Sequence, residues 1–184
     1  MSRWLALLLL AGCASAYAAP DAATPTDDTL TRFLSERAVL LQQLDEMRSN
    51  VAGRTSDLVV TAMGFLGVPY RRGGNSAESG FDCSGFVRAM YEKSVGLILP
   101  RNASQQAHAS EAIDKKDLQP GDLVFFNTMR RAFSHVGIYA GDGKFIHAPR
   151  TGAEVRVEDM NTSYWQRRFD GARRVTPQAL AEQK

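Results

Sequence analysis

The chain has 184 residues, enough for one domain of ordinary size with short appendages. Its composition, 44% hydrophobic and 23% charged, is that of a globular protein and excludes a wholly disordered one. The net charge of +2 is too small to indicate a nucleic-acid-binding protein, although arginines occur in pairs such as Arg71-Arg72 and Arg167-Arg168. Such pairs are most simply solvated surface, and a field that attracts an anionic polymer is the alternative.

The first eighteen residues have the pattern of a secretory signal peptide. Arg3 supplies a positive charge, and residues 4–11 form an apolar run that is too short to span a bilayer. Two cleavage patterns compete, because Leu10-Ala11-Gly12-Cys13 resembles a bacterial lipobox and Ala16-Tyr17-Ala18 resembles an ordinary signal-peptidase site. The lipobox is favoured, with Cys13 as the lipidated N-terminus. We therefore expect an exported, periplasmic protein that is lipid-anchored to the outer membrane; a secreted or soluble periplasmic protein is the alternative.

A spacer at residues 19–27 leads into a predicted helix at residues 28–52. Apart from Arg37, apolar residues recur there at alternating spacings of three and four. These residues are Leu30, Phe33, Leu40, Leu44, Met47 and Val51. We expect Gly53 to end this helix and a second helix to run from Ser56 to Gly67. The apolar stripe is interpreted as packing against the domain, with a stalk or a self-association helix as the alternative.

Residues 68–75 are rich in proline and glycine and are predicted to form a loop that carries Tyr70. A helix should then begin at Cys83, because Asp82 is a good N-cap and apolar residues follow at helical spacing as far as about Ser94. A helix N-terminus favours a thiolate, which predicts a pKa between about 3.5 and 7.5 for the thiol. Cys83 is the only cysteine of the folded body, so it has no disulfide partner there. A nucleophile is favoured over a buried structural cysteine.

The second half of the chain has the pattern of a β-sheet. After a short helical turn near residues 104–108, strands separated by glycine-containing turns are predicted. They cover residues 122–126, 135–140, 144–148, 154–157 and 169–175. N-terminal helices packed on an antiparallel sheet of about five strands define an α+β fold. The catalytic domain should span residues 55–175, followed by a tail at residues 176–184.

The chain has three histidines that could activate a thiol. His108 lies in a polar turn and is predicted to be on the surface. His135 opens an apolar strand and is a candidate general base, because a cysteine nucleophile needs a base within hydrogen-bond reach and a third group to orient that base. His147 lies on the next strand. Two histidines on neighbouring strands can cooperate only if both side chains leave the same face of the sheet.

The turn at residues 141–143 decides the relative position of the two histidines. A three-residue loop would place His147 opposite Gly137, on the same face as His135. A two-residue loop would place His147 opposite Ile138, on the other face. We predict the three-residue turn, because Gly143 can adopt the left-handed conformation that such turns require.

Five blocks of the chain together resemble the NlpC/P60 family of cell-wall cysteine peptidases, over roughly residues 55–175. In chain order the blocks are Pro69-Tyr70-Arg71-Arg72-Gly73-Gly74, Asp82-Cys83-Ser84-Gly85-Phe86, Leu118-Gln119-Pro120-Gly121-Asp122-Leu123-Val124-Phe125-Phe126, Ser134-His135-Val136-Gly137-Ile138-Tyr139 and Phe145-Ile146-His147-Ala148. The resemblance implies a papain-like fold in permuted order. It also implies hydrolysis of the short peptides of bacterial peptidoglycan.

The resemblance assigns roles to individual residues. Cys83 matches the family's nucleophile, His135 its general base and His147 its third polar residue. Tyr70 matches the tyrosine that lines the active site. The remaining matches are positions that contact the substrate in some members, namely Asp82, Ser84 and Ser134.

No cofactor and no metal are expected, since the chain contains neither C-x-x-C nor H-E-x-x-H. The expected partners are peptidoglycan peptides and, through the lipid anchor, a membrane; no nucleic acid is expected, and the oligomeric state is left open. A non-catalytic peptidoglycan-binding module and an acyltransferase that uses the same residues are the alternatives. The bond that is cut also stays open: a γ-D-glutamyl bond to a diamino acid, a D-alanyl cross-link, or the muramoyl amide.

Overall fold

The structure, a computed structural model, describes residues 27–181. The predicted signal peptide, Cys13 and most of the spacer precede these residues and lie outside the described part of the chain, as does the end of the predicted tail. The chain divides into two compact units between Leu44 and Asp45. None of the described helices is long and apolar enough to cross a membrane.

Helix α1 (Asp27–Met63) is continuous. The predicted helix end at Gly53 and the separate second helix from Ser56 are therefore wrong. Gly53 does not adopt the left-handed conformation of a helix C-cap, and a glycine inside a helix costs about 1 kcal/mol relative to alanine without ending it. In the first unit, Phe33 and Leu40 of the apolar stripe are 54% and 55% exposed, so the predicted burial is not observed at these positions.

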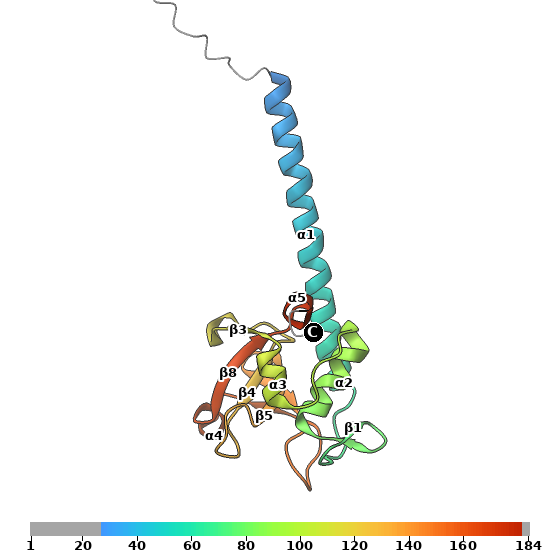
Figure 1. The fold of residues 1–184 in the computed structure, drawn as a ribbon, viewed down its shortest axis with the longest axis vertical. Coiled ribbons are helices and arrows are strands. Elements are labelled where there is room, and N and C mark those ends of the chain that lie inside the picture. The colour runs from blue at the N-terminus through green and yellow to red at the C-terminus, as the bar shows by residue number, and fades with distance from the viewer. Residues whose placement is uncertain (1–26, 182–184) are drawn as a thin grey trace, which may run out of the picture. The chain divides into compact units, whose positions relative to one another are not determined.

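The second unit is built on an antiparallel six-stranded sheet with the strand order β3-β8-β4-β5-β6-β7. Figure 1 labels β3, β8, β4 and β5 of this sheet. Its strands are β3 (Glu111–Ile113), β4 (Leu123–Phe126), β5 (His135–Gly141), β6 (Lys144–His147), β7 (Arg156–Asp159) and β8 (Phe169–Arg174). The predicted α+β class and five of these strands are confirmed. The three-residue strand β3 at the edge of the sheet was not predicted.

Short elements complete the second unit. Strands β1 (Asn75–Ser76) and β2 (Gly80–Phe81) form a small separate ladder. The helices are α2 (Cys83–Val95), α3 (Ala103–His108), a 3₁₀ turn η1 (Lys115–Asp117), α4 (Ser163–Gln166) and α5 (Pro177–Ala181). Helix α2 begins at the predicted residue and ends one residue beyond the predicted end, while α5 lies in the segment predicted as a tail.

Two apolar clusters contain the buried side chains of the sheet. One contains Phe86 and Met90 of α2 with Val136 and Ile138 of β5, and Figure 1 shows α2 and α3 beside the strands. The other contains Phe126, Phe145 and Trp165, and Tyr139 of β5 packs against it. Alternate residues of β5 thus belong to different clusters, as the alternation of side chains along a strand requires.

The β5–β6 hairpin reaches the predicted register by a different route. Gly141 pairs with Lys144, so the loop is the two-residue turn Asp142-Gly143, and the three-residue turn predicted from the sequence is wrong. Both turn residues have positive φ, 50° and 71°, as a type I′ turn requires. A β-bulge then inserts Ala140 between Tyr139 and Gly141. Because the bulge adds one residue to β5, Ile138 pairs with Ile146. One residue further along each strand, this register sets Gly137 opposite His147.

Candidate active site

A cavity of about 870 Å³ contains the predicted nucleophile and the predicted general base in its wall. Of the predicted site residues, Tyr70, Cys83, Ser134 and His135 line it. The lining also includes residues that the sequence did not single out, among them Arg150, Arg156, Glu158, Tyr164 and Trp165. Helix α2 supplies the thiol and strand β5 the imidazole.

The thiol lies at the first residue of α2, as predicted. Asp82 caps the helix in an extended conformation, and its side chain accepts a hydrogen bond from the Gly85 N–H at 2.7 Å. Cys83 is a free cysteine. The first amides of a helix have no intrahelical acceptor, so the N–H groups of Cys83 and Ser84 are available at the mouth of the site.

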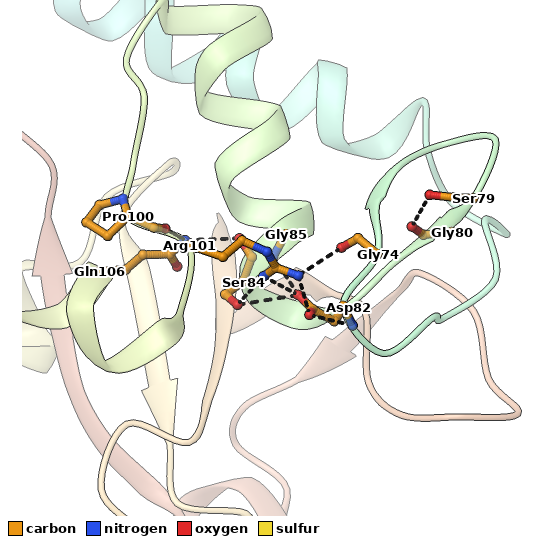
Figure 2. Close-up of polar contacts among 10 residues, drawn as sticks. Gly74, Ser79, Gly80, Asp82, Ser84, Gly85, Pro100, Arg101 and Gln106 are labelled. Carbon is orange, nitrogen blue, oxygen red and sulfur yellow. Dashed lines mark hydrogen bonds and ion pairs between the residues drawn. The ribbon is translucent and has the colours of Figure 1, made fainter.

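Arg101 binds the carboxylate of Asp82 with both terminal nitrogens, at 3.0 Å and 2.7 Å (Figure 2). The Gly73 N–H donates to the same carboxylate at 3.0 Å. Arg101 also donates to the hydroxyl of Ser84 at 3.2 Å. Both oxygens of Asp82 are therefore occupied by donors, which joins the 73–74 loop, the start of α2 and the segment before α3. Sequence reasoning missed Arg101, because its partner is nineteen positions away.

The side chains of Asp82 and Ser84 are directed to Arg101 and are not among those that line the cavity (Figure 2). Their predicted contact with substrate stays a prediction. Ser134 does line the cavity, and its hydroxyl accepts from the N–H of Thr128 at 2.9 Å. It also donates to the carbonyl of Phe126 at 3.3 Å. Ser134 therefore fixes the loop between β4 and β5 directly before His135.

The two predicted histidines form a buried pair. His135 Nε2 and His147 Nδ1 lie 2.7 Å apart, and the two ring centroids are 4.9 Å apart. A Cβ atom on Gly137 would lie 3.2 Å from the Cβ of His147, so only glycine leaves room for this approach. The indole of Trp165 stacks on His135 with a centroid distance of 5.7 Å. His108 is exposed and is not among the residues of the cavity wall, as predicted.

A carboxylate follows the histidine pair. Glu158 Oε1 lies 3.6 Å from His147 Nε2, a buried nitrogen that has no hydrogen-bond partner within the described chain. Trp165 Nε1 donates to Glu158, and Arg156 forms an ion pair with it. Sequence reasoning missed Glu158. The alternation of β7 was the available signal, because pairing with β6 sets Glu158 opposite Phe145, two residues before His147.

Burial keeps the reacting groups neutral in this structure. It raises the pKa of the Cys83 thiol to about 11, and the charge of Asp82 acts in the same direction. Backbone N–H groups of Val136 and Ser84 oppose this shift but do not reverse it. The sequence predicted that the helix N-terminus would lower the pKa of the Cys83 thiol, and this prediction is wrong for the unliganded protein. Burial also lowers the pKa of His135 to about 3, with a smaller effect from His147.

A thiol at a helix N-terminus that shares a cavity with a histidine, itself bonded to a second buried histidine, is the arrangement that cysteine-dependent acyl-transfer enzymes use. The family model for the NlpC/P60 family matches residues 67–174. The chain belongs to the NlpC/P60 family. Within the described residues, no group of three or more His, Cys, Asp or Glu side chains is arranged to hold a metal ion.

Similar proteins agree with this assignment. The chain is 44% identical over 140 residues to the murein DD-endopeptidase MepH of Escherichia coli (strain K12), covering 74% of this chain and 52% of that protein. It is 42% identical over 123 residues to a gamma-D-glutamyl-L-lysine dipeptidyl-peptidase of Bacillus cereus, covering 66% and 36%. The crystal structure of an NlpC/P60 family protein from Bacillus cereus superposes with a TM-score of 0.62 at 41% identity, covering 67% and 40%. The chain thus spans about half or less of the length of these proteins.

Proposed function

We propose that this protein is a peptidoglycan endopeptidase that hydrolyses an amide bond of cell-wall stem peptides or cross-links through a thioester on Cys83. The observation that carries the proposal is the cavity that contains Cys83 and His135, with His147 bonded to Nε2 of His135. The names of the related proteins, a murein endopeptidase and a glutamyl-lysine peptidase, agree with this substrate class.

The acylation step begins with proton transfer, because the thiol and the imidazole are both neutral before substrate binds. His135 takes the thiol proton as the sulfur attacks the substrate carbonyl carbon, and the carbonyl oxygen becomes an oxyanion. The N–H groups of Cys83 and Ser84, which face the sulfur, are placed to bind that oxyanion. The C–N bond then breaks, and His135 gives its proton to the leaving amine.

The deacylation step reverses these roles. A water molecule loses a proton to His135 and attacks the thioester carbon, after which the C–S bond breaks and the proton returns to the sulfur. The products are a peptide with a free carboxylate and the regenerated thiol. His147 keeps the His135 ring oriented through both steps, since it is bonded to Nε2 of that ring.

The wall of the cavity suits a peptide that carries carboxylates. Arg72 and Arg150 are exposed basic residues of this wall. Tyr70, Tyr164 and Trp165 add aromatic surface. Arginine and aromatic side chains together suit a short acidic peptide better than a flat apolar ligand.

The proposal is tested by digesting purified muropeptides with the mature protein and reading the products by mass spectrometry. We expect cleavage products whose masses together equal that of the muropeptide plus one water. The Cys83→Ser protein should give no such products. Their masses assign the bond, since a cut D-alanyl cross-link separates two stems and a cut γ-D-glutamyl bond shortens one stem. Products joined to another amine would indicate an acyltransferase, and intact muropeptides that stay bound would indicate a binding module.

We also propose that the protein is exported to the periplasm and anchored to the outer membrane by lipid on Cys13. The support is the sequence Leu10-Ala11-Gly12-Cys13, with Ala14 in the next position fitting outer-membrane sorting. The intact mass of protein isolated from membranes should correspond to a chain beginning at a lipidated Cys13, and Cys13→Ala should change its processing. A native chain that begins at Ala19 without lipid would contradict the anchor and indicate simple secretion.

A further inference from the structure

The histidine pair leaves open which ring nitrogens carry protons, and the side chain beyond it decides this. A neutral imidazole has one N–H donor and one lone-pair acceptor. His135 Nε2 and His147 Nδ1 lie 2.7 Å apart, so one donates and the other accepts. If His147 donated, the Nδ1 of His135 would carry the other proton and could not take one from the thiol.

We propose that Glu158 is a positioning residue, which holds the proton of His147 on Nε2 so that His135 presents the lone pair of Nδ1 to Cys83. The proposal deepens the function proposed above and rests on it. Glu158 interacts with side chains on the sheet side of the cavity, namely His147, Trp165 and Arg156. It acts through His147.

The environment of His147 Nε2 supports this assignment. That nitrogen is buried and has no hydrogen-bond partner among the described residues. The nearest carboxylate oxygen, Oε1 of Glu158, lies 3.6 Å away and accepts only, because the carboxylate is ionised. Arg156 pairs with the same oxygen. A lone pair on Nε2 would still be repelled by the lone pairs of this oxygen, whereas an N–H is attracted to them. The proton therefore resides on Nε2, and Nδ1 of His147 accepts from His135.

The carboxylate is fixed from two sides. Trp165 Nε1 donates to one oxygen of Glu158, and Arg156 pairs with the other. The neighbouring His147 side chain is the main cause that lowers the pKa of Glu158 to about 2, so the group keeps its charge at neutral pH. Strand register contributes as well, since β7 pairs with β6 and sets Arg156 opposite His147.

The same carboxylate stabilises the charge that appears during the reaction. When His135 takes the thiol proton, a buried imidazolium forms, and a buried charge needs a partner. The charged groups that face His147 are Glu158 and Arg156 of β7, with His135 on its other side. Glu158 raises the pKa of both histidines, while the more exposed Arg156 opposes it at His147. Loss of the Glu158 charge should lower the pKa of the pair further and disfavour the imidazolium.

The proton positions can be measured on the unmodified full chain. Long-range ¹H–¹⁵N correlation spectra of ¹⁵N-histidine-labelled protein distinguish the two imidazole tautomers. We expect Nε2–H on both His135 and His147. His108 is the internal reference, because its Nδ1 lies 2.6 Å from the Ser104 carbonyl and must carry the proton to bond with it. An Nδ1–H tautomer of His147 in the wild-type protein would overturn the proposal.

The functional test uses Glu158→Gln, with Glu158→Ala as the larger change and Glu154→Gln as the matched control on an exposed residue outside the cavity. Loss of an aspartate behind a catalytic histidine costs about 10⁴ in kcat when it fixes the tautomer directly. Glu158 acts through one further ring, so we expect a decrease in kcat of about 10- to 100-fold with little change in KM. The limb of the pH–rate profile that reports the histidine pair should move to lower pH. Glu154→Gln should leave both quantities unchanged.

The wild-type and Glu158→Gln proteins can also be compared without any muropeptide. The rate at which iodoacetamide alkylates Cys83 is measured for each by peptide mass spectrometry. Slower alkylation of Glu158→Gln would support the positioning role even if the wild-type protein cleaved no muropeptide, which separates failure of the proposed function from failure of this inference. A Glu158→Gln protein with wild-type kcat, alkylation rate and pH profile would overturn it. Should this variant fold poorly, as judged by its Tm, the wild-type tautomer spectrum decides alone.

Discussion

The two halves of the active site each contain a carboxylate but use it differently. On the helix side, both oxygens of Asp82 are occupied by the Gly73 and Gly85 N–H groups and by Arg101 (Figure 2). On the sheet side, Glu158 is held by Trp165 and lies next to the buried Nε2 of His147. Asp82 thus binds backbone N–H groups and Arg101, whereas Glu158 lies next to His147, which is bonded to His135.

Burial is the main reason why the proposed nucleophile and the proposed base are both neutral before substrate binds, and the two carboxylates affect this neutrality in opposite ways. The charge of Asp82 disfavours a thiolate on Cys83 and adds to the effect of burial. Glu158 favours imidazolium on the sheet side, but burial outweighs it and the pKa of His135 stays low. The helix side therefore supplies rigid geometry, and the sheet side supplies the charge that becomes useful once a proton moves.

The largest effect should come from the nucleophile itself. Cys83→Ser should reduce muropeptide turnover by at least about 10⁴-fold, because a hydroxyl transfers its proton far less readily than a thiol and the variant retains only binding and the oxyanion site. Thermal unfolding should be nearly unchanged, since the side chain keeps its shape. Turnover close to that of the wild type, measured by product mass spectrometry, would remove Cys83 from the mechanism and with it the peptidase proposal.

Arg101→Ala tests whether the helix side is organised by the ion pair. The change should lower the free energy of unfolding by about 1.5–3 kcal/mol, because the Asp82 carboxylate loses its two charge-assisted hydrogen bonds. Arg101→Lys should restore only part of the loss, since an ammonium group cannot bind a carboxylate in the bidentate manner of a guanidinium. Denaturant unfolding measures both. The control is Arg131→Ala on an exposed residue outside the cavity; if it were as damaging as Arg101→Ala, the ion pair would not be the cause.

Gly137→Ala tests the close approach on the sheet side. The new methyl group would lie 2.6 Å from a ring carbon of Phe145 and 3.2 Å from the Cβ of His147. The resulting overpacking should cost about 1–3 kcal/mol of unfolding free energy and should lower turnover, since the His147 ring must move. Gly53→Ala is the control with the opposite sign: no atom lies within 4 Å of the new methyl, and the continuous helix α1 should gain up to about 1 kcal/mol. Equal stabilities of wild type and Gly137→Ala would mean that glycine is not required there.

Local patterns in the sequence were sufficient for the parts of the site that depend on one element. The N-cap at Asp82 and the apolar spacing after Cys83 placed the thiol correctly, and alternation in β5 placed His135 on the right face. The hairpin shows the limit of counting residues. The three-residue turn was predicted from Gly143, and regular pairing across a two-residue turn would have separated the histidines. The bulge at Ala140 instead shifts the register by one residue and brings them together.

Contacts between distant segments account for what could not be predicted. Arg101 meets Asp82 only because α2 and the segment before α3 fold side by side, and Glu158 reaches His147 only through the register of β7 against β6. The prediction that the pKa of the Cys83 thiol is lowered was wrong for a related reason. A helix N-terminus can be recognised from the sequence, whereas the burial that outweighs it depends on the packed fold.

The smallest predicted effect is a difference in acid sensitivity between the two halves. His135 has a pKa of about 3 in the folded protein, and an unfolded histidine titrates near about 6.5. Between these values the unfolded chain binds a proton that the folded chain does not, so stability should fall as the pH drops below about 6.5, with a slope approaching about 1.4 kcal/mol per pH unit for one such group. The pKa of Asp82 is lowered by Arg101, so its contribution is lost only below about pH 4.

Urea unfolding between pH 7 and pH 5 should therefore report the sheet side. His135→Gln should flatten the slope near pH 5 by about 1.4 kcal/mol per pH unit, and His108→Gln, a change on the surface, should leave it as it is. Equal slopes for wild type and His135→Gln would mean that His135 is already charged in the folded protein, and the neutral thiol–imidazole pair would have to be replaced by an ion pair.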